Sequence, residues 1–138
     1  MSAERDWQLL VLRYEHAFGD LEQAAQAHPA VLPRPDGWGA RAVLAHIVGW
    51  NERIAEEAPS GRFAPSGLSQ EEIDRRNDEF ARTLGGLPWP ELLGRLRRAH
   101  AARLAAAEAL GPGDPLAREL LERAIRHYEA HAGELRGR

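Results

Sequence analysis

The sequence contains no cysteine and no lysine, and it has few hydroxyl side chains. Without cysteine the chain has no disulfide, no thiolate zinc site and no cysteine nucleophile. Without lysine it has no amine for a Schiff base, and all 18 basic residues are arginines. Serine occurs only at Ser2, Ser60, Ser66 and Ser69, and Thr83 is the sole threonine, none of them in a nucleophile-elbow pattern. Conventional nucleophiles are therefore nearly missing, and the six histidines become the main chemical resource.

The length and the charge of the chain exclude several classes of function. A chain of 138 residues predicts one domain over residues 1–138. The net charge of −3 gives no positive field for nucleic acid or an anionic membrane, and the short pairs Arg75-Arg76 and Arg97-Arg98 read as solvated faces. No apolar run approaches the roughly 18–20 residues that span a bilayer. The first residues lack the basic start and apolar run of a secretory signal, so we expect a cytoplasmic protein.

Apolar side chains recur every three or four residues along much of the chain, which predicts helices. Four long helices are expected at about 4–28, 40–58, 90–110 and 115–135, with a shorter one at about 69–83. Segments rich in proline and glycine separate them, and Ser69 and Asp114 are the expected N-caps. The predicted inner face of the last helix carries Leu116, Leu120, Ala124, His127, His131 and Leu135, and that of the helix before it carries Leu92, Leu93, Leu96, His100, Leu104 and Ala107. No strand pattern occurs, so the prediction is an all-α bundle of four long helices.

His127 and His131 are the first candidate ligands. On a helix, residues four apart place their Cβ atoms about 6 Å apart on one face, the spacing with which two imidazoles bind one metal. A His-x-x-x-His pair alone is a weak signal. This pair, however, continues the apolar stripe, where buried imidazole nitrogens need partners that the stripe does not offer.

His46 is the candidate third ligand because of its depth in the bundle. It lies roughly 9 Å from the start of its helix, and the His127–His131 pair lies roughly 10 Å from the end of the last helix. These depths match only if the two helices run antiparallel. That condition requires an up-down-down-up four-helix bundle, with a long crossover between helices two and three. Residues 59–86 can form this crossover.

The other histidines do not meet the depth condition. His16 and His100 are each expected roughly 9 Å below the ion, as hydrogen-bonded or partly exposed residues. His28 is expected at the surface beside a proline. Three imidazoles leave the coordination open, which is typical of a catalytic metal site, although no catalytic residue is assigned.

Two residues beside His46 are candidates for the pocket. A glycine inside a helix costs about 1 kcal/mol relative to alanine, so Gly49 either clears space for a ligand or permits close helix packing. Trp50 either walls the pocket or is an ordinary core aromatic. Glu134, one turn after His131, is a candidate partner for a ligand histidine, although a surface position is the more usual one for a glutamate.

Three segments resemble a known family. Residues 37–50, Gly-Trp-Gly-Ala-Arg-Ala-Val-Leu-Ala-His-Ile-Val-Gly-Trp, are similar to the second-helix signature of the DinB/YfiT-like superfamily, and residues 127–136 are similar to its last-helix signature. Residues 89–104 look like the third helix of its ClbS/DfsB branch. The resemblance implies an up-down-down-up bundle, often a homodimer, with nickel or zinc bound by His46, His127 and His131. It also implies a small-molecule substrate, with a low-molecular-weight thiol as a further partner in some relatives.

Three functions stay open on the sequence. The first hypothesis is a metal-dependent hydrolase, or a related detoxifying enzyme, whose metal-activated water attacks a small electrophile. The second is an S-transferase in which the same metal activates the sulfur of a low-molecular-weight thiol. The third is a non-catalytic protein that sequesters a toxic ligand. DNA binding, which only the superfamily name suggests, is a poor fourth because the basic pairs are short.

Overall fold

The computed structural model describes residues 2–27 and 39–137, and every regular element in these ranges is helical. The elements are α1 (Ala3–Ala27), α2 (Ala40–Glu57), the single 3₁₀ turn η1 (Ala58–Ser60), α3 (Gln70–Leu84), α4 (Trp89–Leu110) and α5 (Pro115–Leu135). These bounds agree with the predicted helices to within two residues. The predicted break after the first helix, and His28 with it, lies outside the described residues.

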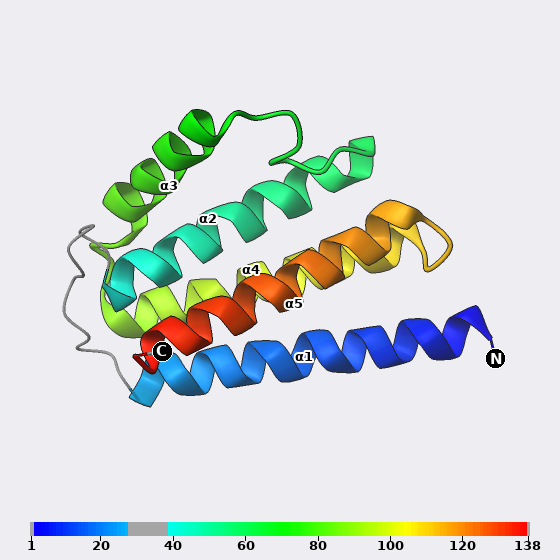
Figure 1. The fold of residues 1–138 in the computed structure, drawn as a ribbon, viewed down its shortest axis with the longest axis horizontal. Coiled ribbons are helices and arrows are strands. Elements are labelled where there is room, and N and C mark those ends of the chain that lie inside the picture. Colours follow the sequence, from blue (N-terminus) through cyan, green and yellow to red (C-terminus); the bar gives the residue numbers. More distant parts are fainter. Residues whose placement is uncertain (1, 28–38, 138) are drawn as a thin grey trace.

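The helices pack in pairs around one core. α1 packs against α5, α2 packs against α4, and α4 also contacts α5. Figure 1 shows that α2 and α4 begin at the same end of the molecule, whereas α1 and α5 run in the opposite direction. α3 lies against the outer side of α2 and reaches it through the crossover that follows η1. Because α2 and α5 run antiparallel, residues near the start of α2 and near the end of α5 lie at a similar depth.

The helix ends follow the capping chemistry of the sequence. Ser69 forms a capping box with Glu72: its Oγ accepts from the Glu72 amide at 3.1 Å, and Glu72 Oε1 accepts from the Ser69 amide at 3.3 Å. The hydrogen bonds that Glu72 Oε1 accepts from the Ser69 amide and hydroxyl lower the pKa of the Glu72 carboxyl. Asp114 caps α5 by accepting from the Leu116 amide at 2.9 Å, and Pro115 occupies the first turn, where its missing N–H costs nothing. Both predicted N-caps are confirmed.

No described helix is both long enough and apolar enough to cross a membrane. The apolar side chains instead face one another. The apolar stripe of α1, whose members are three or four residues apart, is buried at Trp7, Leu10, Tyr14, Phe18, Leu21 and Ala25. Exceptions on the outside of α1 are Leu9 and Leu12, whose side chains are 50% and 65% exposed.

Gly49 is explained by the packing of α3 on α2. A Cβ at this position would lie 2.3 Å from the ring of Phe80, so α3 approaches α2 more closely than any other residue would allow. We expect Gly49→Ala to destabilise the protein by about 1–2 kcal/mol, because the overpacking cost exceeds the gain in helix propensity. Urea unfolding monitored by circular dichroism measures the difference.

Gly19 provides the matched control for this substitution. It also lies inside a helix, but a Cβ there meets nothing within 4 Å. Gly19→Ala should therefore stabilise the protein by up to about 1 kcal/mol through helix propensity alone. Equal effects of the two substitutions would contradict the role of Phe80.

Candidate metal centre

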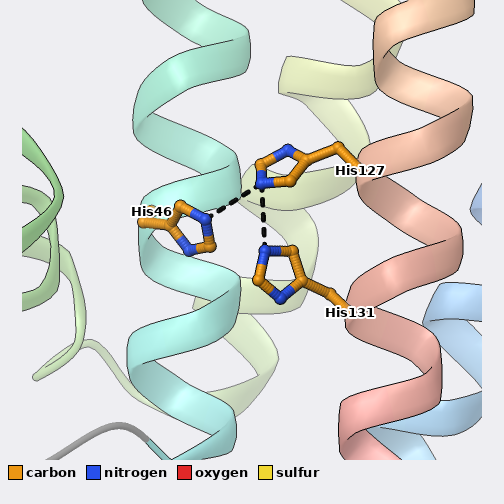
Figure 2. Close-up of side chains that lie close together, drawn as sticks. All are labelled: His46, His127 and His131. Carbon is orange, nitrogen blue, oxygen red and sulfur yellow. Dashed lines mark hydrogen bonds between the residues drawn. The ribbon is translucent and has the colours of Figure 1, made fainter. Parts of the chain in front are cut away.

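Three histidine side chains converge between α2 and α5 (Figure 2). His46 comes from α2, and His127 and His131 come from successive turns of α5. His127 Nε2 lies 3.1 Å from His46 Nε2 and 3.0 Å from His131 Nε2. One ligand atom from each residue lies within 4.8 Å of the other two. The three histidines singled out in the sequence therefore form one cluster.

The spacing of these nitrogens fits a shared ion. Two nitrogens bound to one zinc ion are separated by about 2.9 Å at a right angle and by about 3.3 Å at the tetrahedral angle. Both distances to His127 Nε2 fall between these values. A neutral imidazole nitrogen carries either one hydrogen or one lone pair, so His127 Nε2 cannot make a good hydrogen bond to both neighbours at once. A cation placed among the three nitrogens satisfies all of them.

The partners of the rings favour lone pairs at the centre. Glu134 Oε2 lies 2.9 Å from His131 Nδ1, where a carboxylate accepts from an Nδ1–H and leaves the Nε2 lone pair for a metal. The backbone of Val43 and Ala42, one turn earlier on α2, raises the pKa of His46 and so opposes the effect of burial. The Glu134 side chain is 30% exposed, so it is both a partial surface residue and the partner of a candidate ligand.

The centre is set up to hold neutral imidazoles. Burial lowers the pKa of His46 to about 3, and the neighbouring His131 lowers it further in the same direction. The pKa of His127 is lowered to about 2, chiefly by burial and then by His131, His46 and Arg103. Metal coordination requires the unprotonated ring, so these two residues compete little with protons at neutral pH.

A cavity of about 320 Å³ opens beside the cluster, and its wall includes His46 and His127. Trp50 lies in this wall, and its indole Nε1–H donates to Asn77 Oδ1 of α3 at 2.5 Å. The crossover contributes Phe63 and Pro65. Gly49 does not belong to the cavity wall, because its open side faces Phe80. The two candidate pocket residues thus have different places: Trp50 lines the cavity, whereas Gly49 packs against Phe80.

The cavity wall is rich in arginine and contains no carboxylate among the described residues. Arg103 of α4 and Arg123 and Arg126 of α5 belong to it. Arg123 stacks over the ring of Phe63 at 5.2 Å, and its Nη2 lies 3.9 Å from Glu119 Oε2. The site therefore combines a cluster of three imidazoles with a positively charged wall.

Arg103 is the buried charged residue of the cavity wall that sequence reasoning missed. It is only 2% exposed, and it lies on the inner face of α4 next to the predicted Leu104, which is only partly buried. Its Nε donates to the Leu120 carbonyl at 2.8 Å, and its Nη1 donates to Asn51 Oδ1 at 2.9 Å. The signal in the sequence was a charge three residues after His100 and four before Ala107, on the same apolar stripe.

A chain of hydrogen bonds continues from Arg103 to the surface. Asn51 Nδ2 donates to the Tyr128 hydroxyl at 2.8 Å, and that hydroxyl lies 3.0 Å from His100 Nδ1. His100 Nε2 lies 2.7 Å from Glu15 Oε1, and the His100 ring stacks on Tyr14 and Phe18. If His100 carries its hydrogen on Nε2, each of these hydrogen bonds joins one donor to one acceptor.

The remaining described histidines stay outside the metal cluster. His100 is buried and hydrogen-bonded in the chain just described, which agrees with the hydrogen-bonded alternative predicted for it. Burial lowers its pKa, and Glu15 opposes that effect. His16 is exposed on α1. The depth comparison therefore separated the three clustered histidines from these two.

Comparison with known proteins gives one clear match. Residues 10–131 match the family described as the mycothiol maleylpyruvate isomerase N-terminal domain. No curated protein and no solved structure matches the chain. The family match covers most of the chain, including all three clustered histidines, and it does not extend to the ClbS/DfsB branch. The chain therefore belongs to the mycothiol maleylpyruvate isomerase N-terminal domain family, within the DinB-like superfamily.

Proposed function

We propose that the protein is a divalent-metal-dependent enzyme that joins a low-molecular-weight thiol to a small electrophile. The observation that carries this proposal is the convergence of three Nε2 atoms at the edge of a cavity. His46, His127 and His131 would hold the ion, with zinc or nickel as the candidates. A bound ion of this kind acts as a Lewis acid and favours the ionised form of a thiol or water at its open position.

The residues of the chain support a thiol-dependent reaction in two ways. The cavity wall formed by described residues holds no serine, threonine, cysteine, lysine or carboxylate, so the nucleophile must be brought by a ligand or by water. The family description names mycothiol, a low-molecular-weight thiol, which supports sulfur as the ligand. Glu134 would orient His131, and Trp50 with the crossover would exclude water from the cavity.

Hydrolysis is the second candidate because water can occupy the same open position. Sequestration without catalysis, the third hypothesis from the sequence, makes no use of an open coordination position. A detoxifying role on electrophiles is compatible with either reaction. The reaction type therefore depends on which nucleophile the site accepts.

A thiol-dependence assay tests the proposal. Protein loaded with zinc or nickel is incubated with a chromogenic electrophile, with and without mycothiol or N-acetylcysteine. We expect turnover only with thiol, lost in His127→Ala/His131→Ala. Turnover without thiol would assign hydrolysis instead. Stoichiometric protection from the electrophile that survives removal of all three histidines would assign sequestration.

Two further features belong to the same proposal. We assign the chain to an up-down-down-up bundle, which the helix directions in Figure 1 support. A homodimer is proposed from the family resemblance, and the exposed Leu9 and Leu12 on α1 are compatible with it. A single domain, a cytoplasmic location and the resemblance of residues 89–104 to the ClbS/DfsB branch stay predictions.

A further inference from the structure

We infer that Arg103 forms an oxyanion-binding subsite, so that one of the molecules bound beside the metal centre carries a carboxylate or a similar anionic group. The inference deepens the proposed function and rests on it for the place of the second, metal-bound group. Its basis is a charged side chain that is almost completely buried, that belongs to the cavity wall and that has only neutral partners.

The hydrogen bonds of Arg103 leave part of its guanidinium available. The group has five N–H donors, and the described residues accept from Nε and from Nη1. Neither acceptor is charged: one is the Leu120 carbonyl and the other is the Asn51 amide oxygen. No carboxylate among the described residues forms an ion pair with Arg103. A buried guanidinium with unused donors is costly unless an anion approaches it.

The surroundings fix Arg103 in place without neutralising it. Its two hydrogen bonds tie α4 to α5 and to α2. Asn51 is held in turn by the Tyr128 hydroxyl, and the only carboxylate of that chain, Glu15, lies at its far end beyond His100. The network therefore orients the guanidinium as a preformed donor, as expected of a binding group that must not reorganise.

The charge of the cavity selects the class of ligand. Arg103, Arg123 and Arg126 line the same cavity, and no acidic residue among the described ones does. Arg103 lines the same cavity as the candidate ligands His46 and His127, so its charge lies beside the metal centre. The planar fork of an arginine matches a carboxylate in two parallel hydrogen bonds. A ligand that carries both a sulfur and a carboxylate could therefore bind the metal and Arg103 within this one cavity.

Two experiments test the subsite, one of them without metal. In the first, thermal unfolding of the metal-free full chain is followed with malonate and, at equal ionic strength, with sodium chloride. We expect malonate to raise the Tm of the wild type in a concentration-dependent way. Arg103→Gln should lose the effect. Arg98→Gln, which removes the same charge from an exposed position of α4, should retain it.

The second experiment uses the cobalt-loaded chain and two thiols of the same shape. The sulfur-to-cobalt absorption band reports the binding of 3-mercaptopropionate and of its neutral amide. The carboxylate should bind about tenfold more tightly or better, and Arg103→Gln should abolish most of the preference. Arg103→Lys, which keeps the charge but not the fork, should restore part of it.

The outcomes separate the subsite from the proposed function. If neither thiol changes the cobalt spectrum, the thiol-binding proposal is overturned, and the malonate experiment still decides the subsite. Equal binding of the acid and the amide by the wild type overturns the subsite without any variant, which covers the case in which Arg103→Gln does not fold. A malonate effect of equal size in Arg103→Gln and the wild type also overturns it.

Discussion

Replacing His127 and His131 together with alanine should abolish stoichiometric metal binding. Both residues come from one face of α5, and their Nε2 atoms lie 3.0 Å apart. Their loss leaves only His46, and a single imidazole does not hold a divalent ion against dilution or a mild chelator. We expect about one ion per chain in the wild type and near zero in the double variant. Elemental analysis of protein purified without a polyhistidine tag measures both.

Two further variants make this result specific. His16→Ala removes an exposed histidine and should leave the metal content unchanged. Glu134→Gln removes the carboxylate that lies 2.9 Å from His131 Nδ1 and should weaken affinity by about 10- to 100-fold, as loss of such a partner does elsewhere. An ion retained at full occupancy by the double variant would contradict the site. If Glu134→Gln retained as much metal as the wild type in competition with a chelator, only the role of Glu134 would be contradicted.

The bounds of the helices were predictable because local signals in the sequence mark them. Ser69 and Asp114 supply side-chain caps, prolines occupy first turns, and the apolar spacing of three and four persists between them. These are local effects, so they can be recognised without knowing what a helix packs against. The comparison of depths along the helices added one long-range prediction, that His46 of α2 lies at the same depth in the bundle as the two histidines of α5.

The parts that sequence reasoning missed are the ones that depend on neighbours from other helices. Arg103 was overlooked because a charged residue within an apolar stripe is usually exposed, and only Asn51 and the Leu120 carbonyl make its burial possible. Gly49 had two interpretations until Phe80 of α3 was placed against it. The histidine pair was expected on the stripe itself, whereas Tyr128 occupies the buried centre and His127 and His131 are only partly buried beside it.

The metal-free protein should lose stability steeply between pH 7 and pH 5. The folded-state pKa values of His46 and His127 are about 3 and about 2, both below the ordinary value of about 6.5 that applies when the chain is unfolded. Between those values the unfolded state binds more protons, so stability falls as the pH falls. Each residue contributes about 2 kcal/mol of loss at pH 5, or about 4 kcal/mol together.

Urea unfolding in the presence of a chelator measures this loss. His46→Gln/His127→Gln removes both imidazoles, so the free energy of unfolding should fall by about 4 kcal/mol less between pH 7 and pH 5 than in the wild type. His16→Gln, at an exposed position, should follow the wild type. A slope equal in the double variant and the wild type would mean that the two imidazoles titrate normally in the folded protein. In that case they would also compete with metal at ordinary acidic pH, and the centre would release its ion near pH 6 instead of retaining it well below.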